Sequence, residues 1–410
     1  MILQNCKILG EIDAKPSKSI FQRLLALAIL SNKPTIIQNI SLSEDGQASI
    51  KLIEKLGNEI IIISENSIKI IPHLPTKDAE LNCNESGLCI RMFSPILALF
   101  PYNFTINAVN TLLKRKIDGI QEILTSLGAS VVTNDHYPPI NITGSIKPGD
   151  VRITKLDSSQ FLSGLLIALP FLEEASTITI GNIVSKPYLD LTLYYVKLFG
   201  GKIEFNGNNV FTCYPSEYSG GEFQVENDWT NAATMMIAGA IGGQVQINNI
   251  SSNSPQGDKV ILNLLTEIGA KVIEKDNSIL VVKNELNNFE FDANNFPDLV
   301  PALSVLAANC RDTSTISNVD RLSNKESNRL KEIIKILTDA GIKVEYNNLT
   351  LYITGGKIYS QLIEAKDDHR IAMMAGLLSI NNTSDLKLNG ADSVNKSYPE
   401  FWNDFNSIKK

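Results

Sequence analysis

One pattern recurs five times along the 410-residue chain: an amphipathic helical segment, then a glycine, then an apolar extended segment. The glycines that mark it lie about 70 residues apart, at Gly57, Gly128, Gly200, Gly269 and Gly341. In the second copy, Ile120, Ile123, Leu124 and Leu127 have the i, i+3, i+4, i+7 spacing of a helix with one buried face. A glycine directly after such a helix suits the left-handed residue that ends it. The chain is therefore predicted to consist of one repeated structural unit.

A second set of segments lies between these copies, and its members are apolar around most of their circumference. Such helices are buried on nearly every side. The segments begin, again about 70 residues apart, near Arg23, Arg91, Gln160, Trp229, Leu299 and Arg370. Each unit then holds one buried helix, one surface helix and strands joined by short hairpins, such as the one around Glu65 and Asn66. Six units fill the chain.

The length of the chain favours two domains rather than one core. We expect an α/β protein with three units in each domain. The N-terminal domain is expected to span residues 14–225, and the C-terminal domain residues 226–410 together with residues 1–13. The sixth unit is incomplete, and an opening strand over Ile2–Leu9 is expected to complete it by pairing back.

Composition excludes several classes of protein. The chain is 43% hydrophobic and 20% charged, as globular proteins are. It has no apolar run of the length that a membrane span needs and no signal peptide, so we expect a cytoplasmic protein that does not bind membranes. The net charge of −7 argues against a nucleic-acid groove. Five cysteines without a CxxC pair and three histidines argue for reduced thiols and against a metal site.

Polar clusters stand at the starts of the buried segments: KPSKSIFQR, NESGLCIR, DSSQ, ENDWTN, NFPD and KDDHR. A helix start exposes backbone N–H groups and carries partial positive charge, so it binds anions readily. Lys, Arg, Ser and Gln at such a start donate well to phosphate and carboxylate groups.

Each cluster also has a purely structural explanation. Ser17 or Ser159 suits a helix cap, and Asp298 suits a cap or a turn. The spacing of Lys325, Glu326 and Arg329 is common on a solvated helix face. Capping does not, however, require cationic residues beside so many apolar helices. The joint placement therefore favours binding sites for small anions.

Seven motifs, in order and along essentially the whole chain, resemble the 5-enolpyruvylshikimate-3-phosphate (EPSP) synthase family: KPSKSIFQR, SSQFLSGLL, SKPYLDLTL, FPD, KESNR, DDHRIAM and NKSYPEFW. The resemblance implies two domains, each of three βαβαββ units packed around buried helices, with the active site in the cleft between the domains. It implies transfer of the enolpyruvyl group of phosphoenolpyruvate to the 5-hydroxyl of shikimate 3-phosphate by addition and elimination, with release of phosphate. It implies no cofactor and no metal, and we expect a monomer.

The resemblance also implies roles for particular residues. Those that would bind shikimate 3-phosphate are Lys18, Ser19, Arg23, Ser158, Ser159, Gln160, Ser185, Tyr188, Asp298 and Lys325. Those that would bind phosphoenolpyruvate are Lys18, Gly87, Arg115, Gln160, Arg329, Arg370 and Lys396. Proton transfer would fall to Asp298, Glu326 and Lys18.

The chain departs from the family pattern near two of these residues. Before Gly87 the usual asparagine is Glu85, which brings a carboxylate to an anion site, and Leu88 and Met92 replace threonine and proline. The usual Arg-Pro pair is Arg115-Lys116, so the position of Arg115 rests on its spacing to the glycine at 128.

Two alternatives remain open from the sequence. A sister transferase that uses UDP-N-acetylglucosamine has a similar fold, but it usually carries a cysteine in the loop that matches residues 110–117, where this chain has none. A repeat protein without catalytic activity, such as a ring-forming clamp, would also show an internal period. It would not need the FPD and DDHR motifs.

Overall fold

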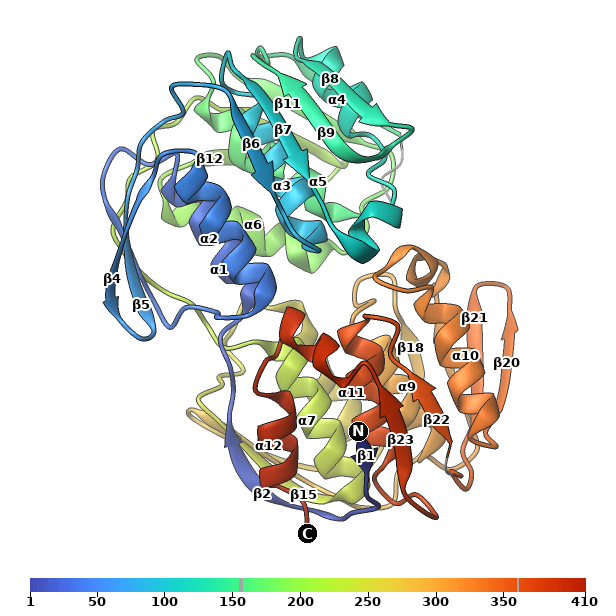
Figure 1. The fold of residues 1–410 in the computed structure, drawn as a ribbon. Coiled ribbons are helices and arrows are strands. Elements are labelled where there is room, and N and C mark those ends of the chain that lie inside the picture. The colour runs from blue at the N-terminus through green and yellow to red at the C-terminus, as the bar shows by residue number, and fades with distance from the viewer. Residues whose placement is uncertain (155–157, 360) are drawn as a thin grey trace. The chain divides into compact units, whose positions relative to one another are not determined.

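The computed structural model describes residues 1–154, 158–359 and 361–410, so Asp157 of the third polar cluster lies outside the described part. The chain divides into two compact units (Figure 1). The N-terminal unit is Pro16–Glu226, and the C-terminal unit is Met1–Lys15 with Asn227–Lys410. Each has its own continuous apolar core.

Helices of two kinds alternate along the described residues. The buried ones are α1 (Lys18–Ala28), α3 (Gly87–Leu97), α5 (Ser159–Ala168), α7 (Trp229–Gly242), α9 (Val300–Ala308) and α11 (His369–Leu378). The surface ones are α2 (Glu44–Lys55), α4 (Ile120–Ser126), α6 (Lys186–Leu198), α8 (Ile261–Glu267), α10 (Arg329–Asp339) and α12 (Phe401–Ser407). Every residue of α3, α7 and α11 is buried, which confirms the prediction for these segments.

The period glycines end five of the surface helices as predicted. All five have positive φ, between 83° and 104°. At Gly57 the glycine N–H donates to Glu54 O, and the next N–H, of Asn58, reaches back to Ile53 O. The other four glycines repeat both bonds, which together form a Schellman motif. One backbone device therefore turns the chain from helix to strand in five units.

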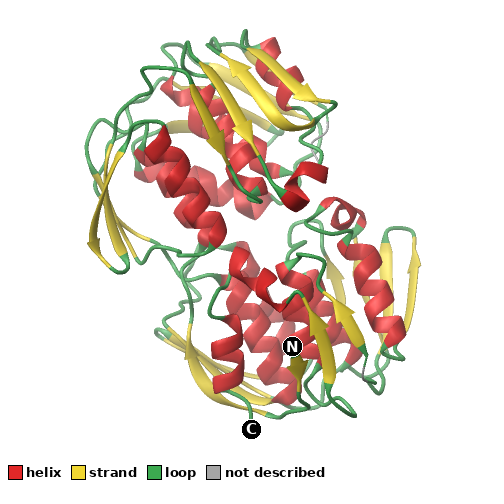
Figure 2. Ribbon diagram, viewed as in Figure 1, coloured by secondary structure: helices red, strands yellow, loops and turns green. Residues whose placement is uncertain are grey.

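The strands of the N-terminal unit form three four-stranded sheets in the described part of the chain (Figure 2), with orders β14-β3-β5-β4, β6-β7-β9-β8 and β10-β11-β13-β12. Their bounds are β3 Thr35–Gln38, β4 Glu59–Ser64, β5 Ser67–Ile71, β6 Ala79–Asn82, β7 Asn103–Asn107, β8 Ser130–Asn134, β9 Tyr137–Thr143, β10 Asp150–Ile153, β11 Ser176–Ile180, β12 Lys202–Phe205, β13 Val210–Tyr214 and β14 Glu222–Gln224. The predicted hairpin at Glu65 and Asn66 joins β4 to β5.

Among its described residues the C-terminal unit has two four-stranded sheets, of orders β16-β17-β15-β2 and β18-β19-β21-β20, and one three-stranded sheet, of order β1-β23-β22. Its strands are β1 Ile2–Leu3, β2 Ile8–Asp13, β15 Gly243–Asn248, β16 Lys271–Lys275, β17 Ser278–Val282, β18 Glu290–Asp292, β19 Thr313–Ser317, β20 Lys343–Asn347, β21 Thr350–Thr354, β22 Leu362–Glu364 and β23 Leu386–Asn389. Short 3-10 turns follow four of the described strands: η1 (Asn110–Lys114), η3 (Gly257–Val260), η4 (Asp320–Asn324) and η5 (Ala391–Lys396). A further one, η2 (Leu169–Phe171), directly follows α5.

The second unit of the repeat, β6-α3-β7-α4-β8-β9, shows the βαβαββ order in full. In each sheet the first pair of strands is parallel: β14/β3, β6/β7, β10/β11, β2/β15, β18/β19 and β22/β23. The remaining pairs of each sheet are antiparallel.

The opening segment differs from the single strand expected over residues 2–9. It forms two strands with different partners. β1 pairs antiparallel with β23 and completes the sheet of the sixth unit, as predicted. β2 pairs parallel with β15 over Ile8–Asp13 and begins the sheet of the fourth unit. The alternation of apolar and polar residues does not distinguish between two sheets that both need an edge strand.

Candidate active site

The predicted site residues share one position in the repeat. In each unit the two parallel strands run side by side, so their carboxyl ends meet at one edge of the sheet. One connection from that edge enters the buried helix, and the other leads toward the surface helix. Ligands of parallel α/β sheets bind outside the carboxyl ends of the strands.

All sixteen predicted residues lie on these connections or in the helices that follow them. On or after the first connection stand Lys18, Ser19, Arg23, Gly87, Ser158, Ser159, Gln160, Asp298 and Arg370. On or after the second stand Arg115, Ser185, Tyr188, Lys325, Glu326, Arg329 and Lys396. The fold therefore gathers them into two sets, one in each compact unit.

Hydrogen bonds join the starts of the buried helices of the N-terminal unit. Gln22 of α1 donates through Nε2 to Ser86 Oγ at the start of α3, over 3.0 Å. Arg91 of α3 donates through Nη1 to Gln160 Oε1 at the start of α5, over 3.2 Å. The three helix starts therefore lie together, with their exposed N–H groups at one end of the unit.

Gly87 lies beneath two guanidinium groups. A Cβ atom at this position would come within 2.8 Å of Arg91 Nη1 and within 2.9 Å of Arg115 Nη1. Both arginines are 6% exposed. Only glycine leaves room for these two cations over the first turn of α3, and together they form an electropositive surface suited to a carboxylate or phosphate.

Glu85, which the sequence places beside this cationic site, binds a neighbouring loop. Its Oε1 accepts the N–H of Thr111 over 3.0 Å and the hydroxyl of Thr111 over 2.8 Å. The two bonds attach this carboxylate to η1, the turn that leads to Arg115.

Arg23 is 1% exposed and links α1 to α6. Its guanidinium donates to Ser19 O at 2.8 Å, to Tyr188 O at 3.1 Å and to Thr192 Oγ1 at 2.9 Å. Burial lowers the pKa of Arg23 to about 10. Arg23 thus fixes the backbone of two other predicted residues.

The predicted serines occupy the starts of α5 and α6. Ser158 caps α5 by accepting the N–H of Gln160 over 3.3 Å, while Ser159 is the first helical residue. Ser185 precedes α6 with a left-handed backbone, φ 50° and ψ 45°. A left-handed residue other than glycine costs conformational free energy and marks a position held by its surroundings.

Lys18 pairs with a residue that the sequence prediction did not include. Its Nζ lies 2.6 Å from Asp45 Oδ2, and both side chains are largely buried. Asp45 stands in the first turn of α2, where an acidic residue is favourable in any helix, so its type alone carries no functional signal.

In the C-terminal unit Arg329 is the central residue and is 1% exposed. It donates to Asp298 Oδ1 at 2.8 Å, to Asp368 Oδ2 at 2.8 Å, and to Glu326. Burial alone would lower the pKa of Arg329, but the carboxylates of Asp368, Glu326 and Asp298 raise it above its usual range. This is a buried ion network rather than a solvated helix face.

Asp298 is not a helix cap, because α9 begins two residues later. Its Oδ1 also lies 3.3 Å from Lys325 Nζ. Burial raises the pKa of Asp298, but Lys325, Arg329 and Arg370 outweigh that effect and hold the pKa well below its usual range. Burial in turn lowers the pKa of Lys325, and Asp298 partly offsets this.

Arg370 stands in the first turn of α11, and Asp368 caps that helix by accepting the Arg370 N–H over 3.0 Å. Arg370 Nη1 donates to Asn231 Oδ1 of α7 over 3.2 Å. Lys396, 4% exposed, donates through Nζ to Asp367 O over 2.5 Å. The bond from Arg370 to Asn231 therefore holds the starts of α7 and α11 together. Lys396 is a second buried cation here, and it binds the loop that precedes α11.

The fourth unit contributes a buried acid that sequence analysis missed. Asp258 of η3 is 4% exposed and accepts the hydroxyl of Thr230 in the first turn of α7. Burial raises its pKa to about 6. Like Arg115 and Lys325, it lies on the connection between the second parallel strand and the surface helix of its unit, here β15 and α8, so the repeat directs attention to this connection.

Glu326, Asp368 and His369 place one potential ligand atom each within 4.8 Å of the others. Distance alone would suit a cation. Arg329, however, already donates to both carboxylates, so the guanidinium occupies the position of positive charge.

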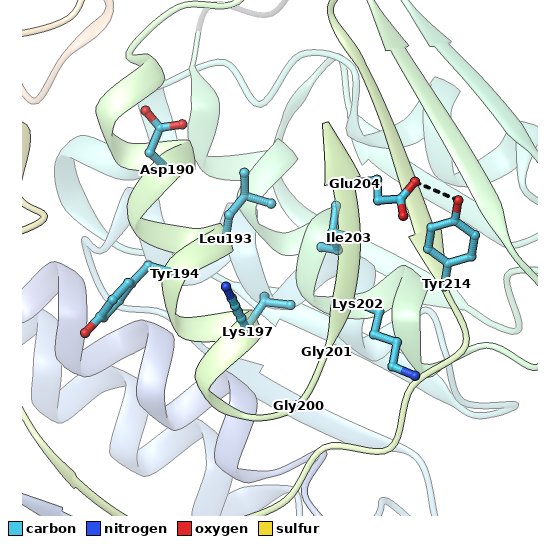
Figure 3. Close-up of a pocket in the computed structure, with 11 residues that line it drawn as sticks. Asp190, Leu193, Tyr194, Lys197, Gly200, Gly201, Lys202, Ile203, Glu204 and Tyr214 are labelled. Atoms are coloured by element: carbon cyan, nitrogen blue, oxygen red, sulfur yellow. Dashed lines mark hydrogen bonds between the residues drawn. The ribbon is translucent and has the colours of Figure 1, made fainter. Parts of the chain in front are cut away.

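A separate open groove of about 920 Å³ lies between α6, β12 and β13 (Figure 3). Its lining includes Tyr194, Lys197 and the hydrogen-bonded pair Glu204 and Tyr214. None of the predicted site residues lines it. Across the described ranges, no helix combines the length and apolar character needed to cross a membrane.

Known proteins of one family match this chain over nearly its whole length. The family model described as EPSP synthase (3-phosphoshikimate 1-carboxyvinyltransferase) matches residues 3–405. A 3-phosphoshikimate 1-carboxyvinyltransferase of Clostridium novyi is 33% identical, with 99% of this chain and 98% of the relative covered. One of Clostridium acetobutylicum is 34% identical, with 98% and 96% covered.

Solved structures agree on the fold. An EPSP synthase from Acinetobacter baumannii superposes with a TM-score of 0.83 at 22% identity, covering 100% of this chain and 97% of the other. The enolpyruvyl transferase NikO from Streptomyces tendae gives a TM-score of 0.78 at 15% identity, covering 100% and 98%. At these identities the superpositions show a shared architecture only.

Proposed function

The chain belongs to the EPSP synthase family and transfers the enolpyruvyl group of phosphoenolpyruvate to shikimate 3-phosphate in aromatic amino acid biosynthesis, and we propose that the two sets of residues described above carry out this reaction. The observation that supports the assignment is the position of all sixteen residues after the carboxyl ends of parallel strands. The group that receives the enolpyruvyl group is the 5-hydroxyl of shikimate 3-phosphate.

Shikimate 3-phosphate binds mainly to the N-terminal set. The phosphate takes hydrogen bonds from Ser158, Ser159 and the exposed N–H groups at the start of α5. The other residues assigned to this substrate are Lys18, Ser19, Arg23, Gln160, Ser185 and Tyr188 of the N-terminal set and Asp298 and Lys325 of the C-terminal set. Arg23 supports the position of Ser19 and Tyr188, because it already binds their carbonyl groups.

Phosphoenolpyruvate binds to cations of both sets. In the N-terminal set, donors come from Arg115, which lies over Gly87, and from Gln160 and Lys18. Arg329, Arg370 and Lys396 supply the other donors. The cations neutralise the carboxylate and the leaving phosphate, whose charge changes during the reaction.

Proton transfer is assigned to Asp298, Glu326 and Lys18. The acceptor hydroxyl adds to C2 of phosphoenolpyruvate and loses its proton while C3 gains one, and phosphate then leaves as C3 loses a proton. Asp298 is a weak base while Lys325 and Arg329 hold its charge. Anionic substrates compete for the same two cations, so Asp298 becomes more basic when both substrates are bound.

The remaining assignments follow from the sequence. We assign the two compact units as the two domains, with residues 1–15 belonging to the C-terminal one. The protein acts as a monomer in the cytoplasm. The reaction transfers an enolpyruvyl group and protons and releases phosphate without a change of oxidation state, so we assign it no redox cofactor, and we assign it no metal.

A phosphate-release assay tests the function. The purified protein is expected to release phosphate from phosphoenolpyruvate when shikimate 3-phosphate is present and not without it. UDP-N-acetylglucosamine is the control acceptor. Release with that sugar nucleotide and not with shikimate 3-phosphate would assign the protein to the sister activity.

A further inference from the structure

We propose that Glu85 is a positioning residue for Arg115 and thereby sets the affinity for phosphoenolpyruvate. The inference rests on the proposed role of Arg115 in binding that substrate. It concerns the position where the family pattern has asparagine and this chain has a carboxylate.

Glu85 fixes the beginning of the turn that presents Arg115. The turn η1 spans Asn110–Lys114, and Arg115 is the residue that ends it. Glu85 Oε1 accepts both the N–H and the hydroxyl of Thr111, at 3.0 Å and 2.8 Å. The neighbouring Asn84 O accepts the N–H of Val109 over 3.0 Å. The loop before α3 thus binds the first residues of the turn through backbone and side chain together.

Arg91 fixes the other end of the same segment. Its Nη2 donates to Lys116 O over 2.7 Å, and its Nη1 donates to Gly87 O over 3.2 Å. Residues 111 and 116 are therefore both attached to the start of α3, with Arg115 between them. This double attachment places the Arg115 guanidinium over Gly87, within 2.9 Å of the place where a Cβ would lie.

The carboxylate has two separable properties. It is an acceptor of the right length to reach Thr111, and it carries a negative charge beside an anion site. Glutamine keeps the length and an acceptor oxygen but has no charge. If positioning is the role of Glu85, glutamine replaces it and alanine does not.

The experiment compares Glu85→Ala, Glu85→Gln and Thr111→Val with the wild-type enzyme in steady-state kinetics. Glu85→Ala is expected to raise the KM for phosphoenolpyruvate about tenfold, since two hydrogen bonds to a charged acceptor are lost. The KM for shikimate 3-phosphate should stay within about twofold. Thr111→Val, which removes one of the two donors, should raise the KM for phosphoenolpyruvate by about threefold. Glu85→Gln should remain within about threefold of the wild type.

Asp78→Ala is the matched control. Asp78 accepts the N–H and the side-chain amide of Asn103, at 2.8 Å and 2.9 Å. It joins the same two strands, β6 and β7, at their opposite ends, away from Arg115. Its loss should leave both KM values unchanged, and the thermal midpoints of all variants report whether they fold.

An unchanged KM for phosphoenolpyruvate in Glu85→Ala would overturn the proposal, and so would equal impairment of Glu85→Ala and Glu85→Gln. If Glu85→Ala fails to fold, Thr111→Val decides the question. Arg115→Ala is measured in parallel. Failure of Arg115→Ala to affect this KM would refute the proposed role of Arg115, whereas an effect of Arg115→Ala without one of Glu85→Ala would refute only the present inference.

Discussion

Replacing Asp258 by asparagine is predicted to stabilise the protein at neutral pH. Asp258 is 4% exposed, and burial raises its pKa from 3.8 to about 6. Asp298 and Asp228 add to that rise, while the hydrogen bond from Thr230 and the charge of Arg370 oppose it. The folded protein therefore holds a proton that the unfolded chain releases at lower pH.

The sign and size of the effect follow from proton linkage. Since the folded state binds more protons between the two pKa values, stability falls as pH rises from about 4 to about 6. Well above both pKa values, a rise in pKa of this size lowers the free energy of unfolding by about 3 kcal/mol. Asparagine keeps the shape and does not titrate. The stability of Asp258→Asn relative to the wild type should thus increase by about 1.4 kcal/mol between about pH 5 and about pH 8.

Urea unfolding of both proteins at these two pH values measures the difference. Asp276→Asn, at an exposed turn of the same unit, controls for the loss of a carboxylate in general. A stability difference that is the same at both pH values would show that burial does not raise the pKa of Asp258 in the folded protein.

Four other substitutions test the assigned roles. Asp298→Asn should lower turnover by about 10²-fold or more with little change in either KM, and near-normal turnover would reduce Asp298 to a partner of Arg329. Arg115→Ala and Arg370→Ala should each weaken phosphoenolpyruvate binding by roughly 10- to 150-fold, and inhibition constants for a substrate analogue check this. Gly87→Ala should raise the KM for phosphoenolpyruvate by about tenfold. The thermal midpoint should not change, because the new Cβ meets the flexible ends of Arg91 and Arg115 rather than backbone. Normal kinetics would contradict the placement of Arg115 over Gly87.

The repeat could be predicted from sequence because backbone geometry imposes it. A helix that turns sharply into a strand needs a left-handed residue, and glycine at positions such as Gly57 and Gly341 provides one. Burial on all sides leaves an equally clear pattern in α7. The opening segment has no such constraint. Its alternation of apolar and polar residues suits the edge of either sheet, so the sequence did not show that β2 pairs with β15.

The residues that pair with the site residues were harder to predict from the sequence. Lys18 is a recognisable motif residue, but Asp45, its partner, looks like any acidic residue at a helix start. Asp258 lies in a segment without a motif, and Asn231 ends the polar cluster ENDWTN, to which the sequence assigned no role. Only the fold brings Asp258 to Thr230 and Asn231 to Arg370. Contacts between distant segments depend on tertiary structure, which local patterns do not encode.

Isotope transfer tests the central claim most directly. Phosphoenolpyruvate labelled with ¹⁸O in the bridging oxygen between carbon and phosphorus is incubated with the protein and shikimate 3-phosphate, and the products are analysed by mass spectrometry. Addition of the 5-hydroxyl to C2 followed by elimination breaks the bond between carbon and the bridging oxygen. The label should therefore leave in inorganic phosphate, and the acceptor should gain an enolpyruvyl group. Label retained on a three-carbon product, with an unmodified acceptor, would mean that the phosphorus–oxygen bond is broken instead and would contradict enolpyruvyl transfer.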